Sequence, residues 1–206
     1  MENLLEGITW LGHASFRIEA PEGVIYIDPW KLKDGVPADL ILITHGHHDH
    51  FSPQDLKMLR KADTAIVSVA DVTAQLQGDV TTVRAGESVI VKGVQIEVIP
   101  AYNRHKQFHP QAAGGVGFII TAGGRRIYHA GDTDAIPEMA DITADVALLP
   151  AGGKYTMNAS EAAQAANLIK PAVAVPMHWG EVVGSRADAE AFRDQCQVHV
   201  EILEPQ

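Results

Sequence analysis

One run of six residues, His45 to His50, constrains this chain more than any other feature. It reads His-Gly-His-His-Asp-His, so four of the ten histidines in the 206-residue chain fall within six positions. The run directly follows Leu40–Ile43, an apolar stretch that predicts a strand buried on both faces of a sheet. A solvated histidine-rich loop is the alternative interpretation. Dense clusters of His and Asp are typical of metal sites, and we therefore expect a metal centre at the end of this strand.

The spacing within the run divides its donors between two ions. His45 and His47 are two residues apart and can chelate one ion, while Asp49 and His50 can turn toward a second. Gly46 allows the backbone to turn tightly between the first two donors. A catalytic zinc-type ion takes three or four ligands and keeps one position for water. Two ions therefore need donors from elsewhere in the chain.

Two later segments supply such donors at predicted strand ends. Asp132 follows a predicted strand at 126–129, and His178 follows a predicted strand at 173–176. Open sheets place their ligand sites at strand ends, where residues distant in the sequence meet. A carboxylate can bridge two cations with its two oxygens, which suits Asp132. His178 would then complete the second ion.

Composition sets the broad class of the protein. The chain is 46% hydrophobic and 20% charged, which is ordinary for a soluble globular protein, and we expect a single domain over residues 1–206. The net charge of −10 argues against binding to nucleic acid. The sequence shows no membrane span and no signal-peptide pattern, and its one cysteine, Cys196, suits a reducing compartment. These features favour a cytoplasmic protein that acts on a small molecule.

The rest of the chain consists of short predicted strands and helices separated by turn residues. Helices are predicted to begin at Ser52, with Pro53 in the first turn, and at Asn158, with Glu161 as its capping partner. A last helix is predicted at 186–195 and an edge strand at 198–203. No feature of the sequence fixes an oligomeric state.

The motifs and their order resemble the metallo-β-lactamase superfamily of metal-dependent hydrolases. Residues 44–50 match its H-x-H-x-D-H signature in full, and the Gly-Asp-Thr at 131–133 and the Met-His at 177–178 follow in the expected order. Segments 8–16 and 26–29 resemble the opening of the branch that includes ascorbate-6-phosphate lactonase-like proteins. The resemblance implies an α/β fold, classed as α+β in some schemes. Its architecture is a four-layer αβ/βα sandwich, in which two mixed β-sheets carry helices on their outer faces and the metals lie at one rim.

The resemblance also implies a ligand set. His45 and His47 would bind the first metal, Asp49 and His50 the second, with Asp132 as the bridge and His178 completing the second. The superfamily usually places a further histidine for the first metal where this chain has Asn103. The polar loop beyond it offers His109 as the candidate and His105 as the weaker alternative. If neither reaches, the first site would be weaker, or the centre would hold one ion.

Three residues are candidates for catalytic roles. Asp49 would orient or deprotonate the attacking water besides binding metal. His13, which alone would read as a buried structural histidine, becomes a candidate for the site through the resemblance. Tyr155 lies in a glycine-rich loop where Lys154 would contact an anionic group, although the loop can equally serve only as the start of a helix. The general acid is left open among His13, His109 and Tyr155. Asp28 is predicted either to accept a hydrogen bond from a ligand imidazole or to serve a turn.

The expected activity is metal-dependent hydrolysis. A metal-bound hydroxide would attack a small, anionic ester, either a lactone or a phosphoester. Two divalent ions are expected, zinc first, with manganese, iron and nickel as alternatives. Two other functions compete with this one. They are a metal-stabilised binding protein without turnover, favoured by Asn103, and a redox di-iron site.

Overall fold

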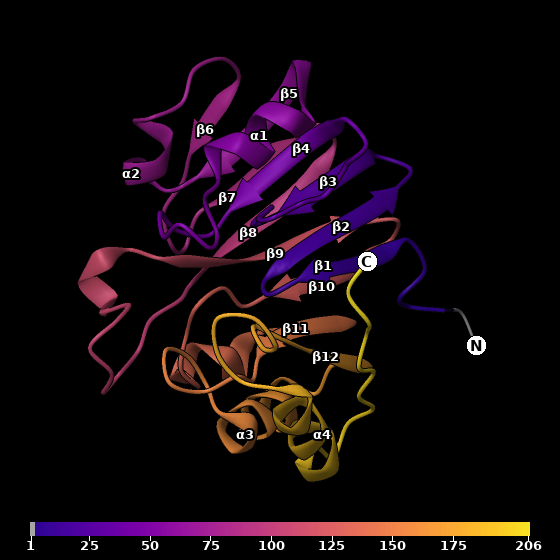
Figure 1. Cartoon of the computed structure of the whole chain (residues 1–206), viewed down its shortest axis with the longest axis vertical. Helices are drawn as coiled ribbons and strands as arrows, with labels where there is room; N and C mark the ends of the chain where they lie inside the picture. The colour runs from indigo at the N-terminus through magenta and orange to yellow at the C-terminus, as the bar shows by residue number, and fades with distance from the viewer. Residues whose placement is uncertain (1–2) are drawn as a thin grey trace.

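The computed structural model describes residues 3–206 and arranges twelve strands in two six-stranded sheets (Figure 1). The first sheet has the order β1-β2-β3-β4-β5-β6, with bounds β1 Ile8–Gly12, β2 Ser15–Ala20, β3 Gly23–Ile27, β4 Ala38–Ile43, β5 Arg60–Ser68 and β6 Val80–Thr82. The second has the order β12-β11-β10-β9-β8-β7, with bounds β7 Ser88–Val91, β8 Val94–Pro100, β9 Val116–Ala122, β10 Arg125–His129, β11 Val146–Pro150 and β12 Val173–Met177. Each sheet is mixed, because β3 to β6 and β10 to β12 pair in parallel and the other neighbours pair antiparallel.

Helices cover the outer faces of both sheets. Figure 1 shows α1 (Pro53–Leu59) and α2 (Ala70–Thr73) beside the first sheet, and α3 (Ala159–Ile169) and α4 (Arg186–Gln195) beyond β11 and β12 of the second. Two short 3₁₀ turns, η1 (Gln111–Ala113) and η2 (Pro137–Asp141), lie in the connections. The predicted α/β class and the two mixed sheets with outer helices are confirmed. Among residues 3–206, no helix combines the length and apolar composition that a membrane crossing requires.

Two helix starts follow the predicted capping chemistry. The hydroxyl of Ser52 accepts a hydrogen bond from the Asp55 amide at 3.3 Å, with Pro53 in the first turn. At α3, the side chain of Asn158 accepts from the Glu161 amide and the Glu161 carboxylate accepts from the Asn158 amide, both at 2.9 Å. This reciprocal pair satisfies donors that the helix itself leaves unpaired.

The predicted edge strand at 198–203 is wrong. Within that segment the chain makes only an isolated bridge, between Val200 and Ala174 of β12. It then crosses to the first sheet, where the Gln206 amide donates to the Trp10 carbonyl at 3.0 Å. Because the segment leaves β12 after one bridge, its alternating apolar residues never form a continuous ladder.

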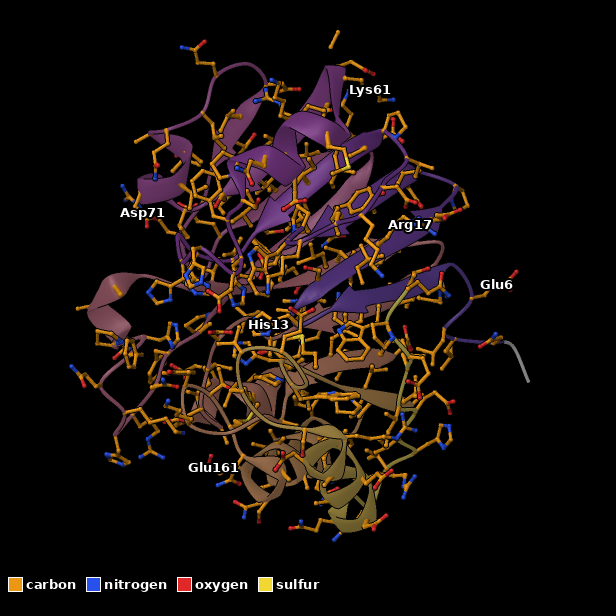
Figure 2. All side chains as sticks on the ribbon, in the orientation of Figure 1. Glu6, His13, Arg17, Lys61, Asp71 and Glu161 are labelled. Carbon is orange, nitrogen blue, oxygen red and sulfur yellow. The ribbon has the colours of Figure 1, made fainter. Side chains whose placement is uncertain are left out.

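The strand ends bring the candidate residues to one rim of the sandwich. β4 is buried on both faces from Leu40 to Ile43 and leads directly into the histidine run. Asp132 follows β10, and His178 follows β12 immediately. His13 lies in the turn between β1 and β2, and Figure 2 shows it near the centre of the view, between the two sheets. The buried strands of both sheets thus fix the positions of the residues that form the candidate site.

Candidate metal centre

The histidine run turns sharply at the end of β4. The amides of His50 and Phe51 both donate to the His47 carbonyl, at 3.0 and 2.8 Å. An added Cβ at Gly46 would lie 2.7 Å from Oδ2 of Asp71 in α2, and this exposed carboxylate would have to shift. The φ of Gly46 is not in the left-handed region, so the tight turn predicted for it is not the reason for glycine. The turn leaves His48 exposed.

Three imidazoles converge in what we call the first group, His45, His47 and His109. Nε2 of His45 lies 3.0 Å from Nδ1 of His47, and Nε2 of His109 lies 2.9 Å from the same atom. Oδ2 of Asp132 lies 3.2 Å from Nε2 of His109 and 3.9 Å from Nε2 of His45. The loop histidine predicted as the replacement donor therefore reaches the other two, whereas His105 is exposed and is not part of the group.

A second group lies on the other side of Asp132 and consists of His13, Asp49, His50 and His178. Oδ1 of Asp132 lies 3.2 Å from Nε2 of His50 and 3.3 Å from Nε2 of His178. Asp132 thus turns one oxygen toward each group. This is the geometry that a bridging carboxylate requires.

The buried polar atoms between the groups are arranged to bind a cation and not to form hydrogen bonds with one another. Within residues 3–206, Nε2 of His50, Nε2 of His178 and Oδ1 of Asp132 are buried and make no hydrogen bond, although they lie close together. Unpaired buried polar atoms are costly, and several converging on one point are explained by a shared ligand. Imidazole and carboxylate donors in this number suit divalent transition metals such as zinc. The residues present therefore fit the binding of a divalent metal ion.

A buried carboxylate outside the two groups fixes the ring of His50. Oδ2 of Asp28 lies 2.7 Å from Nδ1 of His50, and the Thr44 amide and hydroxyl donate to Asp28 at 2.8 and 2.7 Å. With a proton on Nδ1, Nε2 of His50 is the ring atom that could bind a metal ion beside Asp132. Of the two roles left open for Asp28, the structure supports that of hydrogen-bond acceptor.

Asn103 holds the loop that carries His109. Its amide Nδ2 donates to the carbonyls of Phe108 and Tyr155 at 2.8 and 2.6 Å, and its backbone amide donates to the His109 carbonyl at 2.7 Å. The Tyr155 carbonyl also lies 3.3 Å from Nδ1 of His109, which leaves Nε2 of that ring facing the first group. Asn103 stands where the superfamily usually has a metal-binding histidine, and it positions His109, which is another candidate metal ligand. No pattern in the sequence signalled this role.

The three catalytic candidates occupy different positions. A cavity of about 210 Å³ beside the two groups is lined by Asp49 and Tyr155 but not by His13. His13 is fully buried, and its Nε2 lies 3.1 Å from Oδ2 of Asp49. Its carbonyl accepts the amide of His178 at 2.8 Å. His13 therefore positions two members of the second group and does not face the cavity.

Burial and neighbouring charges set the protonation of the centre. Burial holds the pKa of His45 well below its usual value. Burial would also lower the pKa of His50, but Asp132 and Asp28 outweigh it and hold that pKa well above its usual value. Burial would raise the pKa of Asp132, but His178 and His50 outweigh it and keep that pKa well below the usual range. A proton on His50 supplies the positive charge beside Asp132 that a cation would replace.

Comparison with known proteins agrees with this geometry. The β-lactamase superfamily domain matches residues 7–178. The chain belongs to this superfamily. A UPF0173 metal-dependent hydrolase of Methanopyrus kandleri is 34% identical, and the alignment covers 96% of each chain. Membership and this relative confirm the resemblance and place the chain in a family of metal-dependent hydrolases.

Solved structures that are similar over nearly the whole chain include two metal-dependent or metallo hydrolases. One from Parabacteroides distasonis has a TM-score of 0.87 at 33% identity and covers 97% of this chain and 93% of its own. Igni18, a metallo hydrolase from Ignicoccus hospitalis, has a TM-score of 0.81 at 28% identity, with 96% of this chain and 94% of its own covered. The rim that carries the two donor groups is therefore part of a fold shared with a metallo hydrolase.

Proposed function

We propose that this protein hydrolyses an ester bond in a small, anionic substrate, either a lactone or a phosphoester. The observation that carries the proposal is the position of Asp132, whose two oxygens face two separate groups of donors. A purely structural metal site closes its coordination with protein ligands, whereas these groups border an open cavity. That difference favours turnover over a binding role.

The first ion would be held by His45, His47 and His109, the second by Asp49, His50 and His178, and Asp132 would join them. When bound, two divalent ions, with zinc the first candidate and manganese, iron or nickel the alternatives, would lower the pKa of water from about 15.7 toward ~7 and polarise the scissile carbonyl or phosphoryl oxygen.

Two side chains at the cavity support the proton movements of hydrolysis. Asp49 is ionised, because the hydrogen bond with His13 and the charge of His50 together outweigh the effect of burial and lower the pKa of its carboxyl group. Its oxygens can accept a hydrogen bond from an attacking water and fix the direction of approach. Tyr155 lines the same cavity and can donate to the leaving group. Lys154 has its Nζ 4.8 Å from the centre of the Tyr155 ring and is available to an anionic substituent.

Metal stoichiometry with a matched pair of variants tests the proposal. His47→Ala removes a member of the first group, while His48→Ala removes its exposed neighbour, whose side chain is 84% accessible. Elemental analysis is expected to give about two ions per chain for the wild type and His48→Ala, and fewer for His47→Ala. Hydrolysis of a panel of lactones and phosphoesters should fall in step.

The competing functions give different results in the same experiment. Two bound ions without turnover across the panel would favour the metal-stabilised binding protein. Two bound irons with an oxidisable absorption spectrum would favour the redox site. Equal metal content in both variants would overturn the assignment of His47 to the first ion.

A further inference from the structure

The cavity beside the two donor groups has a polar and an apolar part. Phe108, Tyr155 and Val182 line it together with histidines and carboxylates of the two donor groups, and we call these three residues the apolar wall. A substrate whose scissile bond lies at the donor groups can place its adjacent atoms against the apolar wall. The chemistry of this wall therefore bears on the substrate class.

Phe108 and Val182 are unusually exposed for apolar side chains beside a polar centre. They are 45% and 42% exposed, and they are two of six large apolar side chains exposed in the described part of the chain. The other four do not line this cavity; they are Val36, Met58, Ile90 and Leu168. Apolar surface gathered in a cavity with a few convergent polar groups is typical of a ligand site.

Both side chains are fixed to segments that carry donors. Phe108 precedes His109, its carbonyl accepts from Asn103, and its ring meets that of Tyr155 edge to face at 5.1 Å. Val182 lies four residues after His178, in a loop where the Gly180 amide donates to the Val183 carbonyl at 3.1 Å. The apolar wall thus lies on the same segments as His109 and His178, one from each donor group.

The charges around this wall leave its centre apolar. Glu181, next to Val182, has its carboxylate 3.0 Å from Nζ of Lys31 and is neutralised by it. Lys154 is the sequence neighbour of Tyr155, and its Nζ lies over the Tyr155 ring. It offers one cation at the margin of the apolar wall. The carboxylates that line the cavity, Asp49 and Asp132, lie among the candidate metal ligands.

We propose that this wall is a subsite for an apolar acyl or aryl group next to the scissile bond, which makes the substrate an ester with both an apolar and an anionic part. This inference rests on the proposed function, since it concerns the same site. Burying apolar surface at about 25 cal/mol per Å² makes a phenyl group worth about tenfold in affinity over a methyl group when roughly half of its added surface is covered.

Binding of two small metal chelators tests the subsite without turnover. The zinc-loaded protein is titrated calorimetrically with benzohydroxamate and with acetohydroxamate, which share the chelating group and differ in phenyl against methyl. Benzohydroxamate is expected to bind about tenfold more tightly. Equal affinities, or no binding of benzohydroxamate, would overturn the inference.

Matched variants locate the effect. Phe108→Ala and Val182→Ala should each reduce the preference for benzohydroxamate and leave the affinity for acetohydroxamate unchanged. Ile90→Ala removes a side chain that is 74% exposed in β7, and it should leave both affinities unchanged. A preference that survives Phe108→Ala and Val182→Ala together would place the phenyl group elsewhere and overturn the subsite.

The same titrations separate this inference from the proposed function. If the loaded protein prefers benzohydroxamate through Phe108 but hydrolyses none of the esters, the subsite stands and the hydrolytic proposal fails. If it hydrolyses acetyl and benzoyl esters with equal kcat/KM and binds both hydroxamates equally, the hydrolytic proposal stands and the subsite fails.

Discussion

The two donor groups on either side of Asp132 differ in burial. The members of the second group are at most 9% exposed, whereas the first group includes the exposed His47 and the loop residue His109. His50 is fixed by Asp28, and both Asp49 and His178 are fixed by His13. In the first group, His109 depends on a loop between β8 and β9. The two halves of one candidate centre therefore differ in how firmly the fold holds them.

The difference implies unequal affinities for metal. Donors already held in their binding geometry lose little conformational freedom when an ion binds, whereas a loop donor must be ordered at that moment. We expect the second group to bind its ion more tightly and the first group to lose its ion first. At a low metal concentration, a centre that holds a single ion would then hold it in the second group.

The largest effect is expected from Asp132→Asn, which changes the one side chain that both halves share. The amide presents one oxygen instead of two and carries no charge, so one ion loses its ligand and the other keeps only a neutral oxygen. Metal affinity should fall at each site by more than the roughly 10–100-fold that outer-shell changes cost. Competition with a chromophoric chelator measures both affinities. Loss confined to one site would contradict the shared role of Asp132.

Asp28→Asn should weaken the second half more than the first, because Asp28 contacts His50 directly and reaches His45 only through Thr44. The variant keeps the shape of the side chain but removes the charge that orients Nδ1 of His50. A loss of about 10–100-fold in affinity for the second ion is expected, because such supporting hydrogen bonds raise the basicity of a ligand imidazole. Two-site chelator competition checks this result. An equal loss at the first site would mean that the two halves are not independent.

Asn103→Ala should weaken the first half alone. The variant removes two hydrogen bonds of Nδ2, to Phe108 and Tyr155, that hold the His109 loop. At about 0.5–1.5 kcal/mol for each bond, the affinity for the first ion should fall by about tenfold or more. His105→Ala, at an exposed position of the same loop, is the matched control and should bind both ions normally. A normal first site in Asn103→Ala would show that the loop needs no such support.

The sequence predicts those features of the candidate site in which a local pattern fixes the position of a side chain. The apolar strand at 40–43 places the histidine run at a sheet end, and the later strands bring Asp132 and His178 to the same rim. The reach of Asp28 to His50 depends on how β3 pairs with β4 in parallel register. Sequence alternation does not specify strand partners, which is why two roles remained open for Asp28.

The same limit applies to the C-terminal segment and to Asn103. The segment at 198–203 alternates like a strand but leaves β12 after a single bridge, because its direction is set by contacts far away in sequence. The sequence marks Asn103 only as a position where the usual metal-binding histidine is absent. Its hydrogen bonds to Phe108 and Tyr155 join residues 5 and 52 positions away, and no local periodicity reports such contacts.

The smallest effect is expected from Lys106→Gln, which tests the outer end of the His109 loop. Nζ of Lys106 contacts the carboxylate of Asp134 and lies 3.4 Å from that of Glu161, the capping residue of α3. The Asp134 carboxylate also accepts the Arg104 amide at 2.8 Å, so the loop keeps one tie when the lysine is replaced. Partly exposed ion pairs contribute about 0–1 kcal/mol, and the affinity for the first ion should fall by no more than about fivefold, with the second unchanged. Added salt should weaken the first ion's binding in the wild type and less so in the variant, because screening acts on the charge that the variant lacks. An identical salt dependence in both proteins would show that Lys106 does not stabilise the seated loop, and Asn103 alone would then account for the position of His109.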